Sequence, residues 1–309
     1  MPIPILCIVG PTASGKSARA IEEALSRDGL PTQAGEIISV DSRQVYRDLD
    51  IGTEKMSREE MRNVPHHLID IRDPHEPYSA GDFVADAARL IHDITARGNL
   101  PILVGGTHFY FDALLHGLPE NAPPDQELRR ELEGLATDEL YARVRLADPR
   151  RAAELDPHNR RRLVRALEII ATHSSVPLRK SPLSFPVGIN SGHAFLPYDI
   201  EWVVIDLPRE ELRTRIDARL ASAFDRGLIE EVRRVRESLM HHLSPYSVTD
   251  GYESADKRLN ELGLEYRVVG EYLRGERSEE SLLPALSAKL WQYARRQKAW
   301  LRKLTSGFI

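Results

Sequence analysis

The chain has 309 residues, with 42 lysines and arginines against 47 aspartates and glutamates and a formal net charge of −5. Charged residues make up 29% and hydrophobic residues 41%, which excludes collagen-like and wholly disordered chains. A length of about 150 residues per domain predicts roughly two domains. A single cysteine, Cys7, the lack of a signal-peptide pattern and the lack of a long apolar run predict a cytoplasmic protein that meets no membrane.

The first hundred residues alternate short apolar runs with helical patterns. The runs Ile3–Val9, Glu36–Val40 and Pro101–Val104 show no polar alternation, which is typical of strands buried on both faces of a parallel sheet. Helices are expected at Ser17–Ser26 and Gly81–Ala96. This alternation predicts an α/β fold, a parallel sheet with helices on both faces.

A mainly helical insertion is expected at residues 118–200. It should begin with a proline-rich linker at residues 119–124 and end with a long loop at residues 173–197. Between them, helices are expected at Asp125–Leu135, Thr137–Ala147 and His158–Thr172. The α/β pattern then returns with a strand at Trp202–Leu207, followed by helices at Pro208–Arg226, Leu228–His242, Tyr266–Arg274 and Glu279–Lys303. We therefore expect a core of residues 1–117 and 201–309 around the insertion. A wholly helical C-terminal half is the alternative.

The segment Gly10-Pro11-Thr12-Ala13-Ser14-Gly15-Lys16-Ser17 matches the P-loop pattern at every fixed position. An expected buried strand precedes it and an expected helix follows it, which is the context that this motif requires. Backbone N–H groups and Lys16 would bind phosphate oxygens, and the Ser17 hydroxyl suits Mg²⁺. A chance glycine-rich turn is the alternative.

Two further polar residues directly follow expected strands. Asp41 follows the second strand and Thr107 follows the third, so both should lie at the ligand-binding edge of the sheet. Asp41 could hold Mg²⁺ through water, act as a general base, or only cap the next helix. Thr107 could orient an anion or a metal-bound water, or cap a glycine turn.

Basic residues gather in three places despite the acidic total. Arg215 and Arg219 fall on the apolar stripe of an expected helix, where they could reach phosphate or extend to solvent. The segments Arg160–Arg165 and Lys289–Lys303 are also basic, and the second contains tryptophan and tyrosine but no acidic residue. This combination favours binding of RNA or single-stranded nucleic acid, with a solvated helix face as the alternative.

Several segments resemble those of the tRNA dimethylallyltransferases, also called tRNA isopentenyltransferases. Besides residues 10–17, they are Val-Asp-Ser-Arg-Gln and its continuation (40–53), Pro-His-His-Leu-Ile-Asp (65–70), Pro-Ile-Leu-Val-Gly-Gly-Thr (101–107), Arg-Arg-Leu-Val-Arg-Ala-Leu-Glu (161–168) and Tyr-Ala-Arg-Arg-Gln-Lys-Ala-Trp (293–300). The resemblance implies a P-loop NTPase-like fold. It also implies transfer of a dimethylallyl group from dimethylallyl diphosphate to N6 of adenosine 37, next to the anticodon of tRNA, with Mg²⁺.

The resemblance further implies roles for single residues. The leaving diphosphate would be contacted by Lys16, Arg219 and Thr107. Asp41 would take the proton of the amine. The P-loop, residues 10–17, would bind the diphosphate or a nucleotide, and Ser17 would be a ligand of the metal ion. The tRNA contacts would come from Asp41, Ser42, Arg43, Gln44, Arg161, Arg162, Leu163, Val164, Arg165, Arg295 and Arg296.

The sequence departs from this family's pattern in a few places. His108 and Phe109 stand where the family usually has glycine and leucine, and Leu262–Arg267 and Leu290-Trp291 also differ. The alternatives are a P-loop kinase or NTPase for a small molecule, a prenyltransferase for free adenine nucleotides, and a non-catalytic RNA-binding protein. We expect a monomer.

Overall fold

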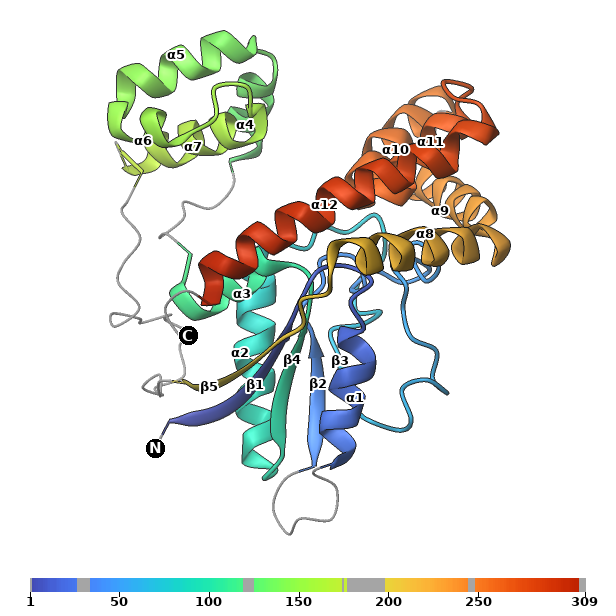
Figure 1. The fold of residues 1–309 in the computed structure, drawn as a ribbon. Coiled ribbons are helices and arrows are strands. Elements are labelled where there is room, and N and C mark those ends of the chain that lie inside the picture. The colour runs from blue at the N-terminus through green and yellow to red at the C-terminus, as the bar shows by residue number, and fades with distance from the viewer. Residues whose placement is uncertain are drawn as a thin grey trace. The chain divides into compact units, whose positions relative to one another are not determined.

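The computed structural model describes residues 2–26, 34–118, 125–173, 175–176, 198–243 and 248–305 (Figure 1). The chain forms two compact units, Met1–Asp112 together with Leu196–Ile309, and Ala113–Phe195. The sequence predicted that the insertion begins after residue 117 and ends at residue 200. In the structure the second unit begins after residue 112 and ends at residue 195, five residues earlier in each case. Among the described residues, no helix is long and apolar enough to cross a membrane.

A parallel sheet in the order β3-β2-β4-β1-β5 forms the centre of the first unit (Figure 1). Its strands are β1 (Ile3–Val9), β2 (Gly35–Ser39), β3 (His66–His67), β4 (Leu100–Gly105) and β5 (Tyr198–Val204). All residues of β2 and β4 and the last five of β1 are buried, which explains their apolar runs without alternation. The prediction of a parallel α/β sheet is therefore confirmed.

The two edge strands differ from the expectation. The short strand β3 was not predicted; it pairs with β2 and is tied to it where His67 Nε2 lies 2.7 Å from a carboxylate oxygen of Glu36. Strand β5 covers residues 198–204, whereas the sequence predicted a strand at 202–207. It lies at the edge of the sheet, where it pairs only with β1, and several of its side chains are exposed. Polar residues in an edge strand hid its beginning in the sequence.

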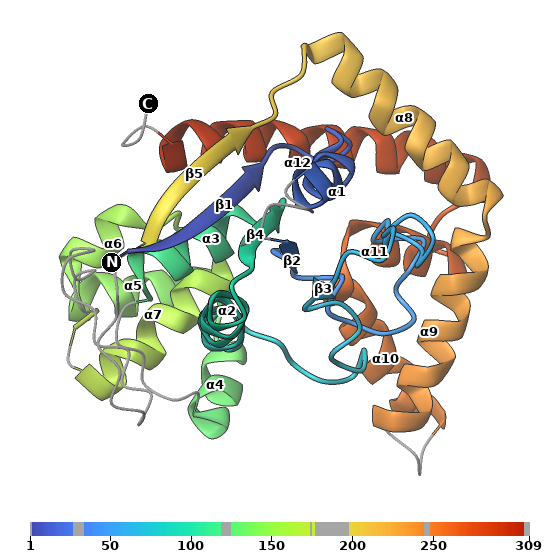
Figure 2. The same cartoon turned by 90° about the horizontal axis from the view of Figure 1, so that it is seen from below.

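Helices cover both faces of the sheet, as predicted. Figure 2 shows α1 (Lys16–Ser26) and α2 (Ala80–Ala96) on opposite faces. Helix α1 packs Ala20, Ile21 and Ala24 on side chains of β1, β2 and β4, while α2 begins with a capping box of Ser79 and Asp82. After β4, the chain enters α3 (His108–His116), which was not predicted.

The C-terminal helices form a second core within the first unit. They are α8 (Arg209–Asp225), α9 (Leu228–Leu243), α10 (Val248–Leu262), α11 (Leu264–Leu273), η1 (Glu279–Ser281) and α12 (Leu282–Thr305). Val45, Tyr46 and Leu49 belong to the same core, so the loop that follows Asp41 packs on these helices. Helix α10 was not predicted, because Gly251 and many polar residues weaken its pattern.

The second unit is a small helical cluster with a core of its own. It contains α4 (Gln126–Glu133), α5 (Thr137–Ala147), α6 (Pro149–Glu154) and α7 (Arg160–His173). The three expected helices are present, and the short α6 is an addition. Leu140, Val144 and Leu163 are fully buried between them. The expected linker at 119–124 and most of the expected loop, residues 177–197, lie outside the described residues.

Candidate active site

The P-loop has the backbone geometry that its sequence predicts. It leaves β1 at Val9 and enters α1 at Lys16, and φ is positive at Ala13 (62°) and Gly15 (89°). A Cβ on Gly10 would lie 2.7 Å from the Ile205 carbonyl oxygen, so only glycine fits there. Positive φ values at a helix N-terminus turn successive N–H groups toward one point, which is a binding geometry for anions.

Lys16 is half-buried beside charges from distant elements. Its Nζ donates to the Pro11 carbonyl oxygen at 2.6 Å. Burial first, and then the Arg219 charge, lower the pKa of Lys16 to about 7, while the Asp41 charge opposes this shift. The structure therefore brings together Lys16, Asp41 and Arg219, which the sequence placed on separate elements.

Asp41 is held by a turn and retains an acceptor. Its Oδ1 accepts from the N–H groups of Arg43 at 2.8 Å and Gln44 at 3.3 Å. Its Oδ2 has no hydrogen-bond partner in the part of the chain that the structure describes. The capping role and a chemical role are thus compatible, because each uses a different oxygen.

Thr107 joins the end of β4 to the turn at Asp41. Its Oγ1 accepts from the Ser42 N–H at 3.1 Å, and its own N–H donates to the Val40 carbonyl oxygen at 3.2 Å. The strands lie so close that a Cβ on Gly105 would meet the Val40 oxygen at 2.0 Å. The predicted meeting of these strand ends is therefore present.

Gln297 is a site residue that the sequence did not indicate. Its side chain on α12 is buried, with 4% exposure. Its Oε1 accepts from the Thr12 N–H and its Nε2 donates to the Gly106 carbonyl oxygen, each at 2.8 Å. One amide thus ties the P-loop to the end of β4. Its place within the basic segment 293–300 was the only signal for it.

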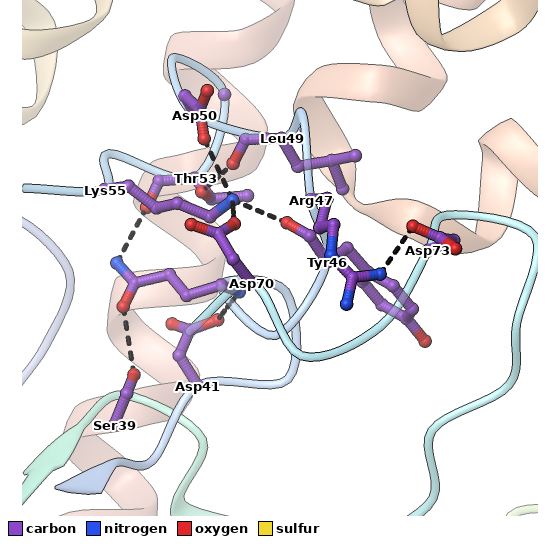
Figure 3. Close-up of polar contacts among 12 residues, drawn as sticks. Ser39, Asp41, Tyr46, Arg47, Leu49, Asp50, Thr53, Lys55, Asp70 and Asp73 are labelled. Atoms are coloured by element: carbon purple, nitrogen blue, oxygen red, sulfur yellow. Dashed lines mark hydrogen bonds and ion pairs between the residues drawn. The ribbon is translucent and has the colours of Figure 1, made fainter. Parts of the chain in front are cut away.

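The loop after Asp41 is fixed by internal polar contacts (Figure 3). The Gln44 Oε1 accepts from the Ser39 hydroxyl at 3.0 Å, and its Nε2 donates to the Thr53 carbonyl oxygen at 3.1 Å. The Lys55 side chain is buried, and its ammonium lies in the middle of Figure 3. The ammonium donates a hydrogen bond to the Tyr46 carbonyl oxygen and pairs with Asp50 and Asp70. A contact from the Gln44 amide to RNA would have to replace these bonds.

A second unpredicted residue, Glu231 on α9, holds the same loop from the other side. Its Oε2 accepts from the N–H groups of Asp50 at 3.0 Å and Ile51 at 2.7 Å. Its Oε1 accepts from the Gly52 N–H at 2.9 Å and the Tyr266 hydroxyl at 2.7 Å. The carboxylate is 2% exposed, and these bonds satisfy it.

Helix α8 presents its arginines differently. The expected apolar stripe of Leu212, Ile216, Leu220 and Ala223 is buried. Arg219 is half-buried, and its charge acts on Lys16 and also on Glu54 and Glu265, the pKa values of which burial raises. Arg215 is exposed and pairs with Glu211 at 2.9 Å. Arg219 therefore belongs to the site, whereas Arg215 lies at the surface near Gly15.

In α7, the candidate tRNA contacts separate into exposed and internal residues. Arg161 and Arg162 are exposed, whereas Leu163 and Val164 lie in the core, so only their backbone could face RNA. Arg165 pairs with the buried Glu168 at 2.7 Å. The structure thus leaves Arg161 and Arg162 as the two guanidinium groups of this set that face solvent.

In α12, the predicted basic face is smaller than the sequence suggests. Arg295 and Arg296 are exposed. Lys298 instead pairs with Asp206 at 2.6 Å, and Trp291 lies under the Arg209 guanidinium, 5.5 Å from its ring centre. Arg295 and Arg296 therefore remain, together with the exposed Arg302, as surface arginines for a partner.

Residues 44–304 match a family model described as IPP transferase. The chain is 41% identical over 307 residues to a tRNA dimethylallyltransferase of Thermomicrobium roseum, covering 97% of this chain and 84% of that one. A crystal structure of the full-length tRNA isopentenylpyrophosphate transferase of Bacillus halodurans is similar, with 33% identity, a TM-score of 0.62 and coverage of 97% and 87%. A eukaryotic dimethylallyltransferase acting on tRNA has 26% identity, a TM-score of 0.75 and coverage of 99% and 72%. These likenesses extend over nearly the whole chain.

Proposed function

The chain belongs to the IPP transferase family and is a prenyl-transferring enzyme, and we propose that it transfers a dimethylallyl group from dimethylallyl diphosphate to N6 of adenosine 37 in tRNA. At one edge of the sheet, a loop shaped for phosphate lies next to the carboxylate of Asp41, which has one oxygen without a hydrogen bond to any described residue. This juxtaposition carries the proposal, because the reaction needs a leaving diphosphate and a proton acceptor side by side.

The diphosphate would lie on the P-loop. As the allylic C1–O bond breaks, its electron pair goes to the diphosphate, and the added charge would be offset by the loop N–H groups, Lys16 and Arg219. A bound anion favours the charged form of Lys16, the pKa of which burial has lowered to about 7. The site would therefore regain a full positive charge when its substrate arrives. Thr107 would orient the diphosphate or a metal-bound water.

The acceptor amine would lie on the opposite side of C1, near Asp41. The N6–C1 bond forms while the N6 proton passes to Asp41 Oδ2, and the turn bonds to Oδ1 keep the carboxylate oriented. An adenine within a stacked loop cannot reach this oxygen, so the base would be extruded from the stack toward Asp41.

A magnesium ion would accompany the diphosphate, with the Ser17 hydroxyl as a protein ligand. Ser17 is exposed and follows Lys16 at the start of α1, and its oxygen is a donor that Mg²⁺ accepts. The described residues contain no group of three His, Cys, Asp or Glu side chains that could hold a metal ion. Such an ion would take its other ligands from diphosphate and water, and when bound it would offset the diphosphate charge.

The exposed arginines of both units would bind the tRNA backbone. Arg161 and Arg162 offer guanidinium groups on α7, and Arg295 and Arg296 offer them on α12. A small-molecule kinase would have no use for these cations. Phosphate contacts of this kind position RNA without reading its sequence.

The proposal is tested by incubating the protein with radiolabelled dimethylallyl diphosphate or ATP, with and without unmodified tRNA. We expect label from dimethylallyl diphosphate in tRNA only. Label in free adenine nucleotides, or turnover of ATP without tRNA, would contradict the proposal and support one of the alternative enzymes.

A further inference from the structure

His108 lies beside the P-loop with a buried atom that has no partner. It is the first residue of α3, directly after Thr107. Its side chain is 4% exposed, and its Nε2 is buried without a hydrogen bond to any residue that the structure describes. Strands β4 and β1 are neighbours, with Val9 opposite Gly105, so the P-loop and the start of α3 leave the sheet side by side. A buried nitrogen without a hydrogen bond destabilises a fold unless a ligand supplies the missing partner.

The surroundings of His108 are those of an anion site. Lys16 is the charged residue that acts on the imidazole: burial first, and then the Lys16 charge, lower the pKa of His108 to about 4. The charges of Arg219 and Asp41 act in turn on the pKa of Lys16. The P-loop hydroxyl of Ser14 is also buried without a partner. Two unsatisfied polar groups beside a lysine at the N-terminus of a helix are typical of an anion-binding site.

We propose that His108 is a further ligand of the diphosphate, and that its Nε2–H donates a hydrogen bond to a diphosphate oxygen beside Lys16. The inference rests on the proposed function, since it takes a diphosphate as the occupant of the P-loop. A neutral imidazole carries one N–H donor, which can serve this bond without any change of charge. Glycine, the usual residue of the resembling family at this place, has no side-chain donor.

The direct test is the affinity of the protein for inorganic diphosphate. His108→Leu removes the donor and keeps an apolar volume in the buried position, whereas His108→Gln keeps a neutral N–H donor. Because a hydrogen bond to a charged group is lost, we expect His108→Leu to bind diphosphate about tenfold to a hundredfold more weakly. His108→Gln should stay within a few-fold of the unchanged protein. His92→Leu, on the exposed surface of α2, is the matched control and should bind normally.

A spectroscopic measurement separates a ligand from a merely structural histidine. In protein labelled with ¹⁵N-histidine, the Nε2 signal of His108 is assigned by its loss in His108→Leu. Addition of inorganic diphosphate to the unchanged protein should shift this signal, because a new acceptor meets its N–H. Inorganic phosphate at the same concentration serves as the comparison and should shift it less. This measurement stands even where His108→Leu fails to fold, since His108→Gln then provides the assignment.

The outcomes distinguish this inference from the proposed function. If the unchanged protein does not bind inorganic diphosphate at all, the phosphate site fails and both ideas are overturned. If it binds diphosphate, but His108→Leu binds equally well and the Nε2 signal does not move, His108 is a buried structural residue. That result overturns this inference and leaves the proposed function intact.

Discussion

In the proposed mechanism, the carboxylate of Asp41 divides two tasks between its oxygens, and a single substitution separates them. Asparagine keeps an oxygen that can accept the N–H bonds of Arg43 and Gln44, so the turn should persist. It cannot take up the amine proton at neutral pH. Since a general base contributes about 10²–10⁴-fold, Asp41→Asn should lower transfer of label to tRNA by that factor. tRNA affinity should change by no more than a few-fold, and near-normal turnover would remove Asp41 from the role of base.

We expect Lys16 to make diphosphate binding depend on pH. Its lowered pKa, about 7, means that the ammonium loses its proton as pH rises through neutrality in the unliganded protein. The charged form binds an anion more tightly, so diphosphate affinity should fall between about pH 6 and about pH 8.5. Lys16→Arg stays charged throughout this range and should lose this part of the dependence. Diphosphate titrations at constant salt measure both proteins, and equal profiles would show that Lys16 does not titrate there.

At the scale of an element, α9 supports the loop that follows Asp41 through Glu231. The substitution Glu231→Gln leaves one carbonyl oxygen where the carboxylate uses both oxygens to accept bonds from the 50–52 loop and Tyr266. Leaving buried donors without an acceptor costs about 1–3 kcal/mol each, so Glu231→Gln should lower the free energy of unfolding by about 2–4 kcal/mol. Glu230→Gln, at the exposed neighbouring position, should change it little. Denaturant unfolding of the two variants tests the contrast, which fails if both behave alike.

The sequence predicts elements well where burial follows one simple pattern. Strands β1, β2 and β4 are apolar throughout because both of their faces are covered, and their positions were found to within a residue or two. Strand β3 has two residues and α6 has six, which is too short for a periodic pattern. Strand β3 forms because it pairs with β2, and α6 forms because it packs against the other helices of the insertion. A local stretch of sequence shows neither of these contacts.

The same distinction holds for the site. The P-loop, Asp41 and Thr107 were predictable, because the ends of parallel strands meet at one edge whatever their distance in sequence. Gln297 and Glu231 were not, since their partners lie far away along the chain, as the bond from Gln297 to Thr12 illustrates. Arg165 and Lys298 looked like surface cations, but each has an acidic partner that only the fold brings near.

At the scale of the whole molecule, the cations proposed for tRNA lie in both compact units. Arg162 is in the helical unit and Arg296 is on α12 of the other unit. The phosphate loop belongs to the unit of Arg296 alone. Small-molecule chemistry therefore needs one unit, whereas tRNA binding by this scheme draws on both.

This division predicts how salt affects a pair of substitutions. Each phosphate contact that is lost should reduce the slope of tRNA affinity against salt by about 0.7–0.9, so Arg162→Ala and Arg296→Ala should each do so. The double variant should lose about twice that amount, because contacts in separate units act independently. Arg89→Ala, on the exposed face of α2, serves as the control, and diphosphate affinity should be unchanged in all of them. tRNA affinities across a salt series give the slopes. Wild-type slopes in both single variants would make these arginines ordinary solvated side chains and would leave tRNA recognition to other residues.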